Sequence, residues 1–164
     1  MRNFFFTFLV LFATHFLSQK KKEVKKFGIK SVVVTETTGA KTITDSKTSY
    51  DADGEVSEEV NYNKEGLLKS TTQYKYNKKG DPIEETEYDE KKQVKEKRTI
   101  KYNALGDKIE ETVVDKDNKF IKKSIYIYGK NGLKTEKKTV DANGNLIISR
   151  KFTYTYKNSK PETD

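Results

Sequence analysis

The sequence of 164 residues contains neither cysteine nor tryptophan, and its single methionine and single histidine are Met1 and His15. The lack of cysteine excludes disulfide frameworks, thiol catalysis, cysteine-based zinc clusters and lipid anchors attached through cysteine. Only 33% of the residues are hydrophobic, whereas 35% are charged. We therefore expect one compact domain with a thin core.

Long apolar runs are also scarce, and the one that stands out is the N-terminal run from Phe4 to Leu17 that follows Arg2. Its 14 residues are too few to span a bilayer, which needs about 18 or more, but suit a signal peptide. We predict a signal peptide over residues 1–18, with cleavage between Ser18 and Gln19. The product would be secreted or periplasmic, without histidine and without a stable membrane span. An uncleaved membrane anchor is the alternative.

The rest of the chain is organised by a repeat of 26 residues. Internal periodicity of this kind indicates that one structural unit is copied along the chain. Five tyrosines occur at this spacing, namely Tyr50, Tyr76, Tyr102, Tyr128 and Tyr154. We predict a repeat domain over residues 28–157, preceded by a basic linker at 19–27 and followed by a disordered tail at 158–164.

Each repeat contains two turns of the form Asx-x-x-Gly, such as Asn63-Lys-Glu-Gly66. The Asx side chain caps such a turn, and glycine supplies the positive φ that ends it. The predicted turn glycines are Gly54, Gly66, Gly80, Gly106, Gly132 and Gly144. Two turns end differently: Asn118 tolerates a positive φ, whereas Lys92 does not and predicts a strained or rebuilt turn.

Between the turns lie segments of alternating polarity rich in Thr, Val, Ile and Tyr, which is typical of half-buried strands joined as hairpins. We predict an all-β fold, an antiparallel meander of about ten strands built from five two-strand repeats, with no helix after residue 18. The apolar residues of the longer segments share one parity. This favours a single-layer sheet, curled on its tyrosine face.

Charge follows the same period, because the shorter segments are acidic and the longer ones are basic. Opposite charges on neighbouring strands would help to fix the strand register. The last hairpin breaks this pattern, since Lys134, Lys137, Lys138, Arg150 and Lys151 face little acid. The C-terminal end of the sheet should therefore be its basic end.

The repeat copies Tyr50-Asp-Ala-Asp-Gly54-Glu-Val56 and Tyr62-Asn-Lys-Glu-Gly66-Leu-Leu68 resemble the YD-repeat of Rhs-type proteins. The resemblance covers residues 50–156. It implies curved β-sheet walls and an extracellular or surface-exposed location, with carbohydrate binding in some members and toxin encapsulation in large ones. This chain is too short to enclose a cargo and lacks the arginine common after the glycine.

Three motifs suggest chemistry, and each has a simpler explanation. Paired carboxylates such as Glu84/Glu85 suggest a glycosidase, but they recur in every repeat, and adjacent strand residues point to opposite faces. Asp51-Ala-Asp-Gly54 and Asp115-Lys-Asp-Asn118 suggest calcium loops but lack the rest of the ligand pattern. We expect neither a metal nor another cofactor.

Two positively charged features suggest polyanion partners. Basic charge beside tyrosines is typical of nucleic-acid binding, but these cations are mostly lysines matched by glutamates, and the leader exports the chain, so we predict no nucleic-acid partner. The segment Lys20–Lys26 could touch anionic lipid or surface polymer, but we favour a disordered, solubilising linker.

The tyrosine column is the best candidate binding surface. If each repeat spans two strands, its rings lie about 9.6 Å apart, which is roughly the length of two sugar units. Cross-strand packing is a structural alternative compatible with binding. The prediction is a non-enzymatic module that binds a glycan or envelope component through its aromatic face. A structural or protein-interaction module of the envelope is the second hypothesis, and an enzyme that uses Tyr, Lys and carboxylates is the third.

Overall fold

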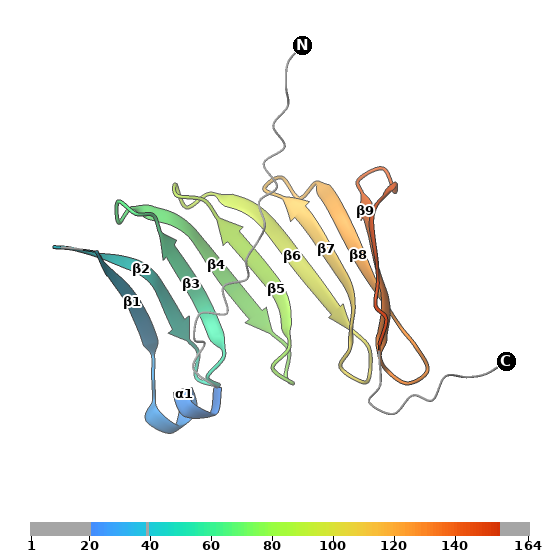
Figure 1. Cartoon of the computed structure of the whole chain (residues 1–164), viewed down its shortest axis with the longest axis horizontal. Helices are drawn as coiled ribbons and strands as arrows, with labels where there is room; N and C mark the ends of the chain where they lie inside the picture. The colour runs from blue at the N-terminus through green and yellow to red at the C-terminus, as the bar shows by residue number, and fades with distance from the viewer. Residues whose placement is uncertain (1–20, 39, 155–164) are drawn as a thin grey trace, which may run out of the picture.

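A computed structural model of the chain describes residues 21–38 and 40–154 (Figure 1). The predicted signal peptide, its cleavage point between Ser18 and Gln19, and the predicted tail at 158–164 lie outside the described residues.

The described chain forms one ten-stranded antiparallel sheet in which every strand pairs with its neighbours in sequence. The strands are β1 Ser31–Thr38, β2 Lys41–Tyr50, β3 Val56–Tyr62, β4 Leu68–Tyr76, β5 Pro82–Tyr88, β6 Val94–Tyr102, β7 Lys108–Asp115, β8 Phe120–Tyr128, β9 Lys134–Asp141 and β10 Leu146–Lys151. β1 and β10 form the two edges, so the sheet is open. The predicted all-β meander of about ten strands is confirmed.

The eight hairpin turns between β2 and β10 repeat one backbone structure, which Asn63 and Gly66 illustrate. Asn63 Oδ1 accepts hydrogen bonds from the backbone N–H groups of Glu65 and Leu67, at 3.0 and 2.9 Å. The N–H of Gly66 donates to the carbonyl of Asn63 at 2.8 Å, and Gly66 has a φ of 83°. This geometry is a type I turn followed by a left-handed bulge residue. All six predicted turn glycines have φ between 76° and 92°.

The two turns without a terminal glycine keep the same backbone. Lys92 has a φ of 61° and Asn118 a φ of 59°, and their N–H groups donate to the carbonyls of Asp89 and Asp115 at 3.0 and 3.1 Å. Asparagine visits this region readily, whereas lysine does so at a conformational cost. The prediction that Lys92 ends a strained turn is confirmed.

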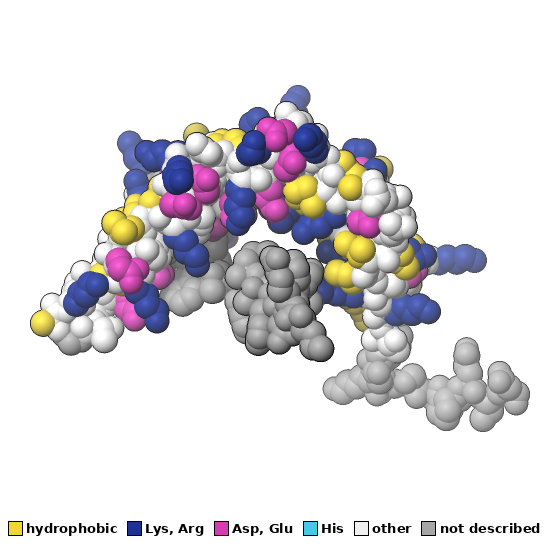
Figure 2. Space-filling view, turned by 90° about the horizontal axis from the view of Figure 1, so that it is seen from above, with side chains coloured by type: hydrophobic (Ala, Val, Ile, Leu, Met, Phe, Trp, Pro, Cys, Tyr) yellow, Lys and Arg dark blue, Asp and Glu magenta, His cyan; other side chains and the backbone are white. Residues whose placement is uncertain are grey.

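The sheet curves into an arch with a hollow on one side (Figure 2). Its most buried strand side chains, Ile100, Val113, Ser124 and Thr139, share one face according to the strand register. Because side chains converge on the inside of a curved sheet, we call this the inner face and its opposite the outer face. The inner face also carries Tyr74, Tyr76, Arg98, Tyr102, Glu111, Tyr126, Tyr128 and Lys137.

The prediction of a disordered basic linker at 19–27 is wrong for most of its length, because Lys21–Phe27 form the helix α1. Val24 is only 2% exposed, and Lys21 Nζ bonds to Glu55 in the β2–β3 turn. The helix ends in a glycine cap. Gly28 has a φ of 62°, and the N–H of Ile29 donates a hydrogen bond to the carbonyl of Val24 at 3.0 Å. Seven residues are too few for a stable isolated helix, so contacts with the β2–β3 turn help to maintain α1.

Candidate functional site

The predicted tyrosine column is present, and its hydroxyl groups bind the backbone. In four members of the column, the hydroxyl group donates a hydrogen bond of 2.8–2.9 Å to the carbonyl oxygen of the residue 20 positions earlier. That residue begins the preceding short strand. These members are Tyr76, Tyr102, Tyr128 and Tyr154. At the first position, the carbonyl of Lys30 accepts from the backbone N–H of Tyr50 at 3.0 Å. The column therefore has a structural role in tying the repeats together.

Anchoring leaves part of each ring accessible. Tyr50, Tyr76, Tyr102 and Tyr128 are half-buried, and Tyr154 is 43% exposed. Burial raises the pKa of Tyr76, and nearby carboxylates led by Glu55 raise it further, so its phenol stays neutral. The rings are thus held in one orientation with a neutral edge, which lowers the entropic cost of any ligand contact.

A second aromatic column, not among the predicted site residues, runs two residues before the first. It consists of Tyr74, Tyr126 and Phe152, with Ile100 in the remaining place. The Tyr74 and Tyr76 rings stack with centroids 6.4 Å apart. Tyr74 donates to Glu59 Oε2 at 2.8 Å. The 26-residue period also predicts this second column. Its position on the inner face, beside the first column, is what makes it part of the candidate site.

Arg98 lies at the centre of the inner face and contacts three carboxylates. Its Nη1 is 2.8 Å from Glu85 Oε2, and its Nη2 is 3.2 Å from Glu96 Oε1. Its Nε lies 3.4 Å from Glu111 Oε1, an ion pair without hydrogen-bond geometry. Burial alone would lower the pKa of Arg98, but the three carboxylates outweigh it and raise the pKa. Arg98 is therefore a fixed cation that joins β5, β6 and β7.

Towards the C-terminal end of the inner face, lysines gather around one aromatic ring. The Nζ atoms of Lys108, Lys134 and Lys137 lie 5.3, 5.1 and 5.0 Å from the centroid of the Tyr126 ring. Tyr126 also donates to Glu111 Oε2 at 3.1 Å, and Lys108 Nζ bonds to the same oxygen. The charge imbalance that the last hairpin shows in sequence is thus concentrated around Tyr126.

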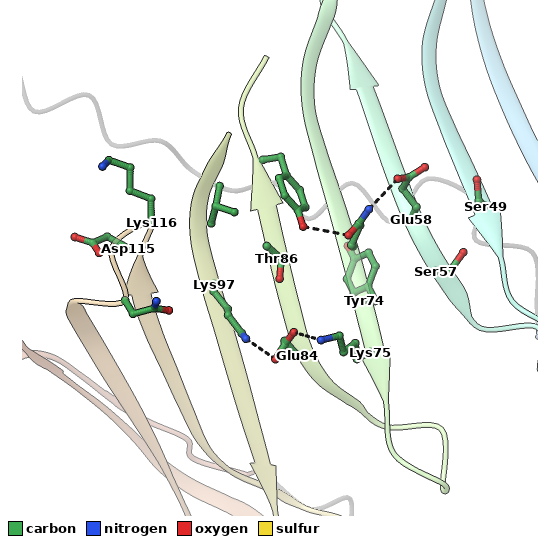
Figure 3. Close-up of a pocket in the computed structure, with 14 residues that line it drawn as sticks. Ser49, Ser57, Glu58, Tyr74, Lys75, Glu84, Thr86, Lys97, Asp115 and Lys116 are labelled. Carbon is green, nitrogen blue, oxygen red and sulfur yellow. Dashed lines mark hydrogen bonds and ion pairs between the residues drawn. The ribbon is translucent and has the colours of Figure 1, made fainter. Parts of the chain in front are cut away.

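A shallow pocket extends from β2 to the β7–β8 turn, and charged side chains within it neutralise one another (Figure 3). Glu84 lies between Lys75 Nζ at 2.7 Å and Lys97 Nζ at 2.8 Å. One repeat later, Glu110 lies between Lys101 and Lys123 at 2.8 and 3.3 Å. The predicted pairing of acidic and basic strands is confirmed here, and these side chains are occupied with one another.

The recurring carboxylate pairs point away from each other, as predicted. Glu84 is on the outer face with Lys75, and Glu85 is on the inner face with Arg98. Hydrogen bonds from Lys75 and Lys97 lower the pKa of Glu84. Burial alone would raise the pKa of Glu111, but Lys108 and Arg98 outweigh it and lower the pKa. Glutamates with lowered pKa values are poorly suited to donate a proton as a general acid.

The two sequences that suggested calcium loops serve turn formation. Asp51 Oδ1 accepts from the N–H groups of Asp53 and Glu55, both at 2.9 Å. Asp115 Oδ1 does the same with Asp117 and Lys119. Within residues 21–38 and 40–154, the side chains form no cluster suited to a metal ion. Over the same residues, no helix has the length and apolar character needed to cross a membrane.

Comparison with solved structures finds several distant structural likenesses. No family model matches the sequence, and no curated protein does. TarM, the S. aureus protein, is 14% identical over 77% of this chain and 22% of its own, with a TM-score of 0.30. The TcdB2-TccC3-Cdc42 structure is 8% identical over 76% of this chain and 9% of its own, with a TM-score of 0.30. A Bacteroides fragilis NCTC 9343 protein with unknown function is 14% identical over 77% of this chain and 95% of its own, with a TM-score of 0.28.

No inference about function rests on these likenesses, because every TM-score is below 0.5 and every identity is below 25%. The fold is that of a β-repeat protein, since ten strands follow one another in a single meander at the period of the sequence.

Proposed function

We propose that this chain is a non-enzymatic binding module that works outside the cytoplasm and holds a glycan or other envelope component on its inner face. The location rests on the N-terminal leader and on the resemblance to YD-repeat proteins, which are extracellular or surface-exposed. The observation that carries the proposal is the column of half-buried tyrosines, whose orientation is fixed by hydroxyl bonds to the backbone. Aromatic rings pack well against the C–H faces of sugars, and one half-buried ring in each repeat matches a polymer whose sugar units also repeat.

Two features support binding over catalysis. The recurring carboxylates are held in ion pairs that keep them charged, as at Glu84 and Glu111. The tyrosine sites are also equivalent from repeat to repeat, as Tyr76 and Tyr102 illustrate. A catalytic centre is needed once, whereas equivalent sites suit a ligand that itself repeats.

The test is binding of a panel of neutral and acidic glycans to the purified protein and to three tyrosine variants. Tyr102→Ala removes a ring from the inner face and should weaken binding. Tyr102→Phe keeps the ring and loses only the hydroxyl bond to Pro82 that orients it, so it should bind more tightly than Tyr102→Ala. Tyr88→Ala is the matched control, because the strand register places Tyr88 on the outer face, where its hydroxyl donates to Gln73 Oε1 at 3.2 Å. Equal affinities for the two alanine variants would contradict the proposal.

Assembly with other chains is the second candidate function, and the open edge at β10 favours it. Leu146, Ile147 and Ile148 are 57%, 52% and 41% exposed there. An exposed apolar edge strand is a template for pairing with another strand. If assembly is the function, the sedimentation coefficient should increase with protein concentration. Ile147→Lys should abolish that increase without affecting glycan binding.

A further inference from the structure

The lysine cluster around Tyr126 differs from the ion-paired groups of the outer face. There, cations flank carboxylates, as in the arrangement of Glu84 between Lys75 and Lys97. Among the described residues, Lys134, Lys137 and Arg150 have no carboxylate within 4.0 Å. Three cations on neighbouring strands thus share one face without a counter-charge of their own.

These cations are close together because the strand register requires it. Lys137 of β9 pairs directly with Tyr126 of β8 on one side and with Arg150 of β10 on the other. Lys134 Nζ lies 5.1 Å from the Tyr126 ring and 5.5 Å from the Phe152 ring. The ammonium groups therefore gather over the same aromatic rings, where their mutual repulsion would be reduced by a bound anion.

The ionisation of Lys137 reflects this crowding. Burial lowers its pKa, and the nearby Lys108, Arg150 and Arg98 lower it further, while Glu111 acts in the opposite direction. One carboxylate is thus set against several cations. A bound anion would relieve the repulsion among the cations and raise the pKa of Lys137.

We propose that the cluster formed by Lys108, Lys134 and Lys137 around Tyr126, with Arg150 beside Lys137 on β10, is a binding site for the anionic groups of an acidic polysaccharide. This inference rests on the proposed function and adds the charge class of the ligand and its place on the inner face. The cations would bind carboxylate, sulfate or phosphate groups, which share negatively charged oxygens. The aromatic rings of the two columns lie on the same face and would contact the sugar units.

The distribution of charge favours an acidic polysaccharide over a nucleic acid. Nucleic acids place a phosphate at every nucleotide and require cations along their whole path. The inner face instead becomes acidic towards its N-terminal half, where Glu59 bonds to Tyr74 and Glu85 to Arg98. A polymer with intermittent charge fits this gradient, because its neutral stretches can cross the part that lacks free cations.

The test compares the affinity of the purified protein for dextran sulfate and for neutral dextran, which differ only in charge, with polygalacturonate as a carboxylate-bearing probe. The protein should bind both acidic polymers, more weakly as salt is raised. Lys134→Gln combined with Lys137→Gln should weaken binding about tenfold, which corresponds to about 1.4 kcal/mol. The matched control, Lys75→Gln with Lys101→Gln, removes the same charge from the outer face and should change affinity less than twofold.

A second pair of variants separates charge from folding. Lys134→Arg with Lys137→Arg keeps both charges and should bind dextran sulfate like the original protein, and far-ultraviolet circular dichroism should be the same for all variants. Equal losses in the inner-face and outer-face glutamine variants would overturn the inference, since they would indicate attraction by net charge alone. Failure to bind either acidic polymer, or tighter binding to double-stranded DNA, would also overturn it.

The same measurements distinguish this inference from the function on which it rests. Binding of neutral glycans that Tyr102→Ala weakens, without binding of acidic polymers, would leave the proposed function intact and refute only the anionic site. Failure to bind any glycan would refute both.

Discussion

The β5–β6 turn ends in Lys92, at a position where six other turns have glycine, and its φ of 61° should cost stability. A non-glycine residue in the left-handed region costs about 1–2 kcal/mol. Glycine removes that cost but loses about 0.5–1 kcal/mol through its greater freedom in the unfolded chain. Lys92→Gly should therefore raise the free energy of unfolding by about 0.5–1 kcal/mol.

Urea unfolding followed by circular dichroism measures this difference. With a slope of about 2 kcal/mol/M, the midpoint should rise by about 0.3–0.5 M. The neighbouring change Lys91→Gly is the matched control, because it removes the same charge at a residue without positive φ and should not stabilise the protein. The reverse change, Gly106→Ala, should lower stability by about 1 kcal/mol through conformation alone, since a Cβ there meets nothing within 4 Å.

The reasoning would be refuted if Lys92→Gly left the midpoint unchanged or lowered it while Gly106→Ala was tolerated. That outcome would mean that the turn does not require a left-handed residue at its fourth position in solution.

Three further changes test the sheet itself. Tyr102→Phe should lower the free energy of unfolding by about 1 kcal/mol in urea titrations, because the hydroxyl bond to Pro82 is lost; an unchanged midpoint would contradict the structural role of the column. Val113→Ala should cost about 2 kcal/mol by the same assay, because Val113 is 1% exposed in a thin core, and a cost below 0.5 kcal/mol would argue against that core. Acid should also destabilise the sheet. The lowered pKa of Glu111 stabilises the fold above its ordinary value of 4.5, and this contribution is lost as pH falls from there through the folded-state pKa. The melting temperature of Glu111→Gln should accordingly depend less on pH in this range than that of the original protein. An equal pH dependence would mean that Glu111 does not contribute to the acid sensitivity.

The turns and the strand order were predictable because the interactions that specify them are local. Asn63 and Gly66 are three residues apart, and the side chain of the first and the backbone of the second close the turn between them. Eight such turns at regular spacing join successive strands as hairpins, and a series of hairpins forms a meander. The strain at Lys92 was readable for the same reason, since a left-handed position follows from its place in the turn.

Helix α1 was not predictable in this way, because the stabilising contacts come from outside it. The segment is short and rich in lysine, and Val24 is its one buried side chain. Lys21 bonds to Glu55, which is 34 residues away in sequence. The local signal that remained was Gly28 after Phe27, a glycine placed where a helix cap needs it.

The sequence by itself determined the period, the turns, the strand count and the parity that brings the tyrosines to one face. The tertiary structure decided that the tyrosine hydroxyls reach carbonyls 20 residues away and that Lys134 and Lys137 converge on Tyr126. The physical reason is that periodicity specifies alternation along each strand, whereas curvature, and with it the convergence of side chains from different strands, arises only when the strands are paired and twisted together.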